Sequence, residues 1–437
     1  MQKNQLQKIA SYCLYLVIIL IPFNARHILN FEKIKAIEGF RENLSWSVYF
    51  FDPILIFLFI AILLIHFSHK RVNFNLKKVI YQPLFWLFLI IILNLLLSNE
   101  KNLAIYQIIR LTIAIGLFLS IRFSLRDKKV KSNVVLLIFI GGIFQSLIAA
   151  LQFILQKSVG LKIIGESVIA PNVLGVAKFE IYGEKILRAY GTFPHPNLLA
   201  VFLVLSLASG WWLWTQRNQK IKSLYLLAGT LFIGVGLIAT FSRSGFLAAF
   251  LLLILFLLNN WKKIANPLKI VFAQKTALAL AGLLLILGIG FSVYKLVQPR
   301  LCYNCPEENS IQLRRTYSTY AQKIITEKPL LGVGFGSFTL ILKEKSTELA
   351  NYGIQPVHNL YLLIATELGV LGLVFWLLFV LKYSHATKRN LSNPFFSTLL
   401  VFLLVGFIDH YFWTLPQGQL IFYLSLALQE KLKVSMA

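Results

Sequence analysis

Charged side chains are scarce in this chain of 437 residues, where Asp, Glu, Lys and Arg together make up 14%. Hydrophobic residues make up 57%, and the mean hydropathy is +0.72. Soluble globular domains carry about a quarter of their residues as charged ones. The composition therefore excludes that class. Several apolar runs are long enough for the roughly 20 residues of helix that cross a bilayer, and open strands are excluded in lipid.

Acidic residues are especially few, with 17 Asp and Glu against 43 Lys and Arg and a net charge of +26. Such an excess could indicate nucleic-acid binding, but the basic residues fall in short clusters between apolar runs, such as "HKRVNFNLKK", "RFSLRDKKVK" and "KYSHATKRN". Short basic loops between apolar helices are typical of the cytoplasmic side of a membrane protein. We therefore reject nucleic acid as a partner and expect these clusters, with both termini, in the cytoplasm.

Several motifs are also missing. No small-residue cleavage site follows the first apolar run, so we expect it to be retained as a helix, with Cys13 a buried thiol in it. "GVGFGSF" has no Lys-Ser/Thr at phosphate-loop spacing, which argues against a nucleotide. No paired-carboxylate motif is visible, and Cys302 and Cys305 alone cannot complete a zinc site. We expect no metal and no cofactor, and a local disulfide between these two cysteines.

The pattern predicts an all-α polytopic membrane protein with about twelve spanning helices in a single domain, 1–437. One large extracytoplasmic loop, 298–358, should contain amphipathic helices; the segments 28–47, 156–196 and 409–418 should share its side of the membrane. The expected spans are 10–27, 48–66, 79–97, 103–123, 133–155, 197–215, 222–240, 244–259, 277–297, 359–381, 395–410 and 417–430.

The large loop carries two adjacent arginines, Arg314 and Arg315. The stretch 311–327 has helical spacing of apolar residues and ends before Pro329, so it predicts an amphipathic helix lying on the membrane or over a cavity. Guanidinium groups on such a helix suit an anionic partner because they bind phosphate oxygens in pairs. The alternative is a solvated face or one that contacts lipid headgroups.

His358 ends the large loop at the mouth of the next predicted span, in "PVHNLYLLIATELG". An unperturbed histidine has a pKa of about 6.5 and can act as a general base near neutral pH. The alternative is a histidine hydrogen-bonded at an interface. Asn359 could orient His358 or cap the following helix.

Two further arginines stand out. Arg243 lies in a turn between apolar helices, in "TFSRSGFLAAF", where it could act on substrate or simply extend to lipid headgroups. Arg110 lies two turns inside a predicted helix, where its charge needs a partner or a ligand phosphate.

Two compact polar turns supply the remaining candidates. "RAYGTFPHPNLLAVF" contains His195, which could bind substrate or belong to a structural elbow, and Asn197, placed to start a helix. Asp409 and His410 lie at the outer end of the eleventh predicted span and could pair with each other or with an arginine. We count all four as candidate substrate-binding residues, with Arg110, Arg315 and Asn359.

Four of these motifs together resemble the bacterial O-antigen ligase family: "FSRSG", an arginine fifteen residues before "PLLGVGFGSF", "HNLYLLIATELGVLG" and "DHYFWTLPQG". The resemblance is strongest over residues 190–420. Each motif is weak alone, and their order around one large loop is the more specific signal. By motif, Arg243 and Arg314 match the family's arginines and His358 its loop histidine, while Arg315 leaves the loop arginine open by one residue.

The resemblance implies a membrane glycosyltransferase that moves a glycan en bloc from undecaprenyl diphosphate to an acceptor hydroxyl at the outer face of the cytoplasmic membrane. It would use neither a metal nor a nucleotide sugar. Arg243 and Arg314 would hold the diphosphate and His358 would deprotonate the acceptor. Membrane lipids and a glycan, lipid or protein acceptor would be its partners.

Other functions remain open at this point. Within the same superfamily, an O-antigen polymerase or a protein O-oligosaccharyltransferase would differ in the acceptor. A transporter of polysaccharide or lipid belongs to another class, but transporters bind near the bilayer midplane with repeat-related broken helices. The candidates here gather at one predicted face, and no repeat is visible. A protein that only binds polysaccharide would explain the arginines and histidines less well.

Overall fold

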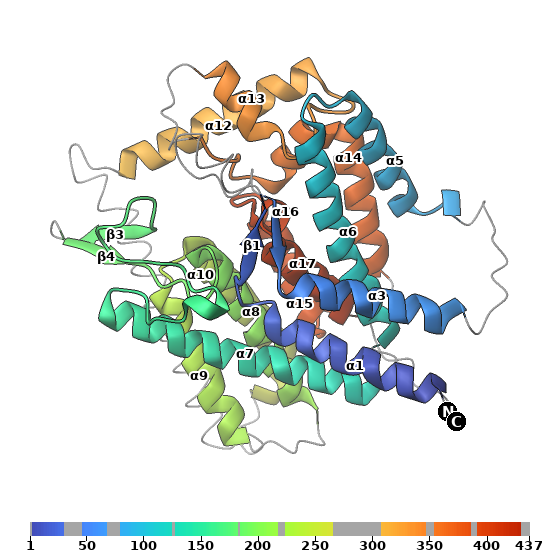
Figure 1. The fold of residues 1–437 in the computed structure, drawn as a ribbon. Helices are drawn as coiled ribbons and strands as arrows, with labels where there is room; N and C mark the ends of the chain where they lie inside the picture. The colour runs from blue at the N-terminus through green and yellow to red at the C-terminus, as the bar shows by residue number, and fades with distance from the viewer. Residues whose placement is uncertain are drawn as a thin grey trace.

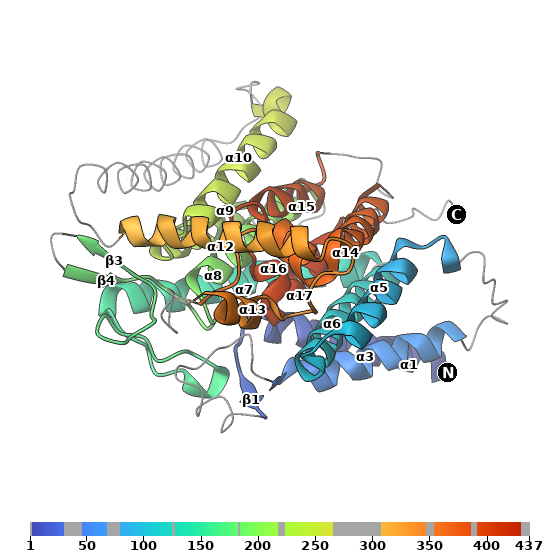
Figure 2. The ribbon, with the colours of Figure 1, turned by 90° about the horizontal axis from the view of Figure 1, so that it is seen from above.

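The computed structural model describes residues 2–29, 46–67, 79–124, 127–181, 184–216, 223–264, 307–346, 354–385 and 391–429. Within these ranges the chain is mostly helical, and the helices pack around one extended apolar core (Figures 1 and 2). Many helix surfaces expose Leu, Ile and Phe, as expected where lipid replaces water. The protein is a helical membrane protein.

The first half of the chain supplies α1 (Gln2–Leu20), α3 (Phe51–Phe67), α5 (Pro83–Leu97), α6 (Lys101–Ser124) and α7 (Lys128–Leu155). Helix α1 packs against α3 and α7, and α3 against α6. Asp127 caps α7 by accepting a hydrogen bond from the Lys129 N–H. Polar residues are rare in these helices, so each buried one needs a partner within the bundle.

The second half supplies α8 (Pro196–Thr215), α9 (Ser223–Ala239), α10 (Arg243–Ile264), α14 (Leu360–His385), α15 (Pro394–Val405), α16 (Tyr411–Thr414) and α17 (Pro416–Leu428). Helix α8 is buried on nearly all sides and packs against α7, α9, α10 and α15, which fits its uniformly apolar surface. Helix α17 packs against α6 and so joins the two halves. Gln417 Nε2 also donates to Asn24 Oδ1, at 3.1 Å, at the end of the turn that follows α1.

Four helices are long and apolar enough to cross a membrane: Lys101–Ser124, Lys128–Leu155, Pro196–Thr215 and Leu360–Ser384. Shorter apolar helices lie at six further expected spans: Gln5–Leu20, Phe51–Ile65, Pro83–Leu97, Leu224–Ala239, Arg243–Asn259 and Pro394–Val405. The expected span 277–297 lies outside the described residues, and the expected span 417–430 corresponds to α17, which is not among these ten helices. The full count of twelve therefore stays a prediction.

Two antiparallel strand pairs add to the all-α architecture expected from hydropathy. Strand β1 (Arg26–Ile28) pairs with β2 (Ser47–Tyr49), and β3 (Lys178–Ile181) pairs with β4 (Glu184–Leu187). They lie in the polar segments between helices, where local backbone pairing satisfies N–H and C=O groups that no helix uses. Strands this short leave no hydropathy signal.

Helices α12 (Glu307–Glu327) and α13 (Phe338–Lys345) lie across one end of the bundle, above α14 and α16 in Figure 1. The amphipathic helix expected over 311–327 is present as α12. Tyr317, Ala321 and Ile324 are buried on its inner face, while the side chains of Arg314 and Arg315 are exposed.

Candidate functional site

Several polar side chains meet beneath α12, at the starts of α8, α10, α14 and α16. We call this group the arginine–histidine cluster; it comprises Arg188, His195, Asn197, Arg243, Arg314, His358, Asp409 and His410. Hydrogen bonds join some members, and electrostatic effects on pKa values connect the others. Its residues come from segments far apart in the sequence.

Asp409 joins three of these helices through one buried carboxylate, which is 5% exposed. Its Oδ2 accepts hydrogen bonds from Asn197 Nδ2 at 2.9 Å and from Ser244 Oγ at 3.5 Å, and its Oδ1 accepts one from the His410 N–H at 3.0 Å. Burial raises the pKa of Asp409 to about 6, although the His410 N–H and the charge of Arg314 favour the ionised form. Asp409 and His410 thus interact through the backbone of His410.

Arg188 is a member that the sequence reading missed. Its Nε donates to the Thr240 carbonyl at 2.9 Å and its Nη2 to Asn197 Oδ1 at 2.6 Å. Burial lowers the pKa of Arg188 to about 10; Tyr190 and Asp409 oppose the shift, and the charges of Arg243 and Arg314 add to it. Arg188 opens the "RAYGTFPHPN" turn, but no pattern in the sequence places that turn beside Thr240.

The turn from Arg188 to Asn197 is held by two buried glutamines of α7. Gln145 Nε2 donates to Thr192 Oγ1 at 2.8 Å, and its Oε1 accepts from the Thr192 N–H at 2.9 Å. Gln152 Oε1 accepts from the N–H groups of Tyr190 and Gly191 at 2.9 and 2.8 Å. These bonds fix the backbone that carries Arg188, because buried backbone groups are costly to leave unpaired.

Arg243 begins α10, in a turn whose two serines serve the cluster. Ser242 Oγ accepts from the Gly245 N–H at 3.1 Å, as an N-cap does, and donates to Asn197 Oδ1 at 3.0 Å. Ser244, on the other side of Arg243, donates to Asp409. The "FSRSG" motif thus fixes Arg243 between two anchored hydroxyl groups, where its charge acts on Arg188.

Arg314 faces the cluster from α12. Its charge lowers the pKa values of Arg188, His195, His358 and His410 and favours the ionised form of Asp409. Arg315 contributes to none of these five shifts. These electrostatic effects therefore favour Arg314 over Arg315 as the arginine of α12 that acts on the cluster.

His358 lies between α12 and α16. Its ring stacks on that of Tyr317, with centroids 6.2 Å apart and 12° between the planes, and meets the ring of His410 edge-on at 5.0 Å. Burial and then the charge of Arg314 lower its pKa to about 4, against a smaller opposing effect of the Pro356 carbonyl. The buried Nδ1 of His358 has no hydrogen-bond partner among the described residues.

The two other histidines are hydrogen-bonded within the protein. His195 caps α8, because its Nδ1 accepts from the Asn197 N–H at 3.1 Å. Burial, and then Arg188 and His358, lower its pKa to about 3. His410 Nδ1 pairs with Thr414 Oγ1 at 2.8 Å, and burial, with His358 and His195, lowers its pKa well below the usual value. All three imidazoles are therefore neutral at pH 7.

Asn359 caps a helix, the second of the two roles considered for it. Its Oδ1 accepts from the N–H groups of Tyr361 and Leu362 at the start of α14, each at 3.0 Å. Its Nδ2 donates to the Phe407 carbonyl at 3.3 Å, which ties this end of α14 to the link between α15 and α16.

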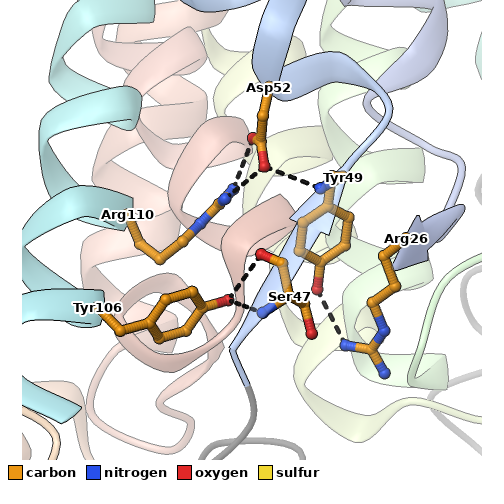
Figure 3. A network of polar contacts seen from close by, with 6 residues as sticks. All are labelled: Arg26, Ser47, Tyr49, Asp52, Tyr106 and Arg110. Carbon is orange, nitrogen blue, oxygen red and sulfur yellow. Dashed lines mark hydrogen bonds and ion pairs between the residues drawn. The ribbon is translucent and has the colours of Figure 1, made fainter. Parts of the chain in front are cut away.

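Arg110 lies in a separate polar network (Figure 3), and of the two roles considered for its charge the structure shows pairing with a protein partner. Its guanidinium pairs with the Asp52 carboxylate through two bonds, of 2.6 and 3.0 Å, beneath the strand pair β1–β2. Asp52 Oδ2 also accepts from the Tyr49 N–H at 2.8 Å, and Tyr106 OH bonds the backbone of Ser47. Arg110 is thus a buried residue of α6 that is connected to β2 through the carboxylate of Asp52.

The expected disulfide between Cys302 and Cys305 lies outside the described residues. Cys13, in α1, is a free thiol, but it is half-buried and not buried as expected. The described residues contain no group of three or more His, Cys, Asp or Glu side chains placed to hold a metal ion.

A protein-family model described as O-antigen ligase matches residues 228–377, which include Arg243, Arg314 and His358. Over this region the chain is similar to the O-antigen ligase family. The resemblance read from the motifs is therefore confirmed. The O-antigen ligase region supplies only part of the cluster, because Arg188, His195, Asn197, Asp409 and His410 lie on either side of it in the sequence.

Three Rickettsia proteins named as candidate polysaccharide ligases resemble a shorter stretch. The one from Rickettsia felis is 34% identical over 101 residues, which is 20% of this chain and 24% of the relative. Those from Rickettsia conorii and Rickettsia typhi are 32% and 34% identical over 105 and 104 residues, each 21% of this chain and 25% of the relative. The match thus spans about a quarter of the relatives' length.

Proposed function

We propose that this protein is a membrane glycosyltransferase that moves a glycan en bloc from undecaprenyl diphosphate to an acceptor hydroxyl. The observation that carries the proposal is the cluster, in which Arg188, Arg243 and Arg314 gather near the single carboxylate of Asp409, beside a neutral histidine. This arrangement suits a ligand that brings its own negative charge.

The arginines bind the diphosphate of the donor in this proposal. Guanidinium groups pair with phosphate oxygens in a fixed fork, and they stabilise charge best where water is excluded. Arg188 is already oriented by Thr240 and Asn197, so it loses little side-chain freedom on binding. The three guanidinium groups would supply the charge neutralisation that a divalent ion supplies elsewhere, and the proposed transfer needs no metal.

His358 acts as the base. Its unpartnered Nδ1 accepts the proton of the acceptor hydroxyl, whose oxygen attacks the anomeric carbon. The bond from that carbon to the diphosphate oxygen breaks, and its electron pair leaves with the diphosphate. Attack opposite the leaving group inverts the anomeric centre.

Donor binding strengthens this base. Burial and the positive field of Arg314 hold the pKa of His358 at about 4. A diphosphate beside Arg314 offsets that field, because opposite charges within a few ångströms favour the protonated imidazole. His358 therefore becomes a better proton acceptor once the leaving group is in place.

We place the site at the outer face of the cytoplasmic membrane, with both termini inside. The basic loops support this orientation, since such loops remain in the cytoplasm. Helix α12 and the starts of α8, α10 and α14 would then face the outer leaflet, where a lipid-linked glycan is presented.

The test is transfer by the purified full-length protein in lipid nanodiscs. The protein is incubated with undecaprenyl diphosphate carrying a short glycan and with lipid, glycan or peptide acceptors, and the products are weighed by mass spectrometry. We expect a product heavier than the acceptor by the whole glycan, and the acceptor that works distinguishes a ligase from a polymerase or a protein glycosyltransferase. Movement of the intact donor between leaflets without any product would instead identify a transporter.

A further inference from the structure

Helix α14 is broken at Gly369, where the backbone leaves the helical conformation at φ 72° and ψ 176°. The glycine-rich segment 329–337, which we call the glycine loop, fills the break. The N–H groups of Val333 and Gly334 donate to the carbonyls of Thr366 and Glu367 at 3.0 and 3.1 Å. The Val370 N–H donates to the Pro329 carbonyl at 2.8 Å. The loop thus supplies partners for backbone groups at the break.

Glycine at 369 and 332 is what permits this close approach. A Cβ on Gly369 would lie 2.0 Å from the Leu330 carbonyl oxygen, and one on Gly332 would lie 2.6 Å from the Glu367 carbonyl carbon. Both residues also have positive φ, which other residues rarely adopt. Both "LLGVGFG" and "ELGVLG" contain glycine where the two backbones touch.

Asn94 of α5 holds the glycine loop in this break through all its hydrogen-bonding groups. Its Nδ2 donates to the Leu331 carbonyl at 2.6 Å and to the Glu367 carbonyl at 2.8 Å, and its Oδ1 accepts from the Phe335 N–H at 2.9 Å. Asn94 is 2% exposed in an otherwise apolar helix. Burying an amide there is costly unless it is fully paired, and here it is.

The glycine loop connects the elements that carry the cluster. It begins two residues after α12, the helix of Arg314, and it contacts α14, which follows His358. Phe335 stacks on Trp413 of α16, with centroids 4.9 Å apart, and Trp413 Nε1 donates to the Glu367 carboxylate at 2.8 Å. In Figure 1, α12, α13 and α14 converge with α5 at this end of the molecule.

We infer that Asn94 is a positioning residue for the transfer reaction, one that sets the placement of Arg314 relative to His358 by fixing the glycine loop. The inference rests on the proposed function. Asn94 lies outside the O-antigen ligase region, and its three bonds go to the glycine loop and α14. Its effect on the reaction therefore passes through the backbone of the loop.

The expected effect of Asn94→Ala is large, because a displacement of about 1 Å at a catalytic group can cost about 100-fold in rate. The substitution removes the Asn94 partner of the Phe335 N–H and of the Leu331 carbonyl, and it leaves the Glu367 carbonyl with the Gly334 N–H as a donor. We expect the rate of transfer at limiting donor to fall by about 100-fold, with weaker donor binding. Asn94→Ser, which keeps a shorter hydroxyl group at this position, should lie between wild type and Asn94→Ala.

The experiment compares wild type, Asn94→Ala and Asn94→Ser with Asn133→Ala in nanodiscs. Asn133 is a matched control, since its Nδ2 donates to Tyr15 OH at 3.1 Å between α7 and α1, away from the glycine loop. Hydrogen exchange of peptides covering 329–338, measured by mass spectrometry, reports the loop directly. We expect Asn94→Ala to lose protection at Val333, Gly334 and Phe335, and Asn133→Ala to keep both protection and transfer. If Asn94→Ala does not fold, Asn94→Ser is judged by the same two measurements.

Two results would overturn the inference. One is unchanged exchange in the glycine loop of the Asn94 variants; the other is faster exchange with transfer equal to wild type. Failure of the proposed function looks different, because wild type itself would then give no product with any acceptor. The inference about the reaction would fall with it, while the exchange data would still show whether Asn94 holds the loop.

Discussion

Arg314 and Arg315 are neighbours on α12 with exposed side chains, and of the two only the charge of Arg314 shifts pKa values within the cluster. The variants Arg314→Ala and Arg315→Ala therefore each remove one arginine side chain from the same helix, but they should differ in their effect on donor binding. We expect Arg314→Ala to weaken binding of an undecaprenyl diphosphate glycan and Arg315→Ala to leave it close to wild type.

The magnitude follows from the contact that Arg314 would make. A hydrogen bond to a charged group contributes about 1.5–3 kcal/mol, which corresponds to about 10- to 150-fold in affinity. Because Arg314 is exposed before the donor binds, solvent screening places its effect at the lower end, about tenfold. The rate of transfer at limiting donor concentration should fall by at least the same factor if the contact between Arg314 and the diphosphate strengthens as the diphosphate leaves.

The assay is equilibrium binding of a fluorescent undecaprenyl diphosphate glycan to protein in nanodiscs, at fixed ionic strength. Hydrogen exchange of α12 verifies that both variants keep the helix. Equal binding by Arg314→Ala and wild type, or equal losses in the two variants, would refute the reasoning that only one arginine of α12 faces the donor.

Three more predictions concern the histidines of the cluster and the separate pair of Arg110 and Asp52. Arg314→Ala should move the acid limb of kcat/KM, which reports the free enzyme, to higher pH, because the arginine lowers the pKa of His358; an unmoved limb in a pH–rate profile would contradict this. The free energy of unfolding should decrease as the pH falls from about 6.5 to about 4. The pKa values of His195 and His358 in the folded protein, about 3 and about 4, lie below the ordinary 6.5, so the unfolded chain takes up more protons in that window. His195→Asn, which can keep the cap of α8, should lose less thermal stability over that window than wild type. If the melting temperatures of the variant and of wild type fall equally between these pH values, His195 makes no contribution to the pH dependence. Asp52→Ala should destabilise the protein by about 3–5 kcal/mol in thermal or denaturant unfolding, because it leaves Arg110 buried and unpaired, while Asp52→Ala and Arg110→Met together should recover much of the loss.

The sequence predicted the helical elements well because apolar periodicity is a local signal. The inner face of α12, with Tyr317 and Ile324 buried, follows from spacing alone. The cap of α14 was also within reach, since Asn359 was considered for that role; Asn197 lies at the start of α8 as expected, but His195 is the residue that caps α8.

The cluster was only partly predictable, because its contacts join distant segments. Arg188 was missed since its partners, Thr240 and Asn197, are identified only once the turn is folded. Arg110 was placed with the substrate because its counter-ion, Asp52, lies 58 residues away in sequence. Asn94 carries no motif at all, and its importance comes from a break in α14 that hydropathy does not reveal.

The bond between Gln417 and Asn24 spans 393 residues. A ribosome makes the turn after α1 early and the segment around Gln417 late, so Asn24 must remain without this partner while nearly all the intervening helices are inserted. The closing of the bundle is thus a late event in biosynthesis. Chains interrupted before α17 would hold α12 and its arginines without the contact between α6 and α17, which is one of those that join the two halves.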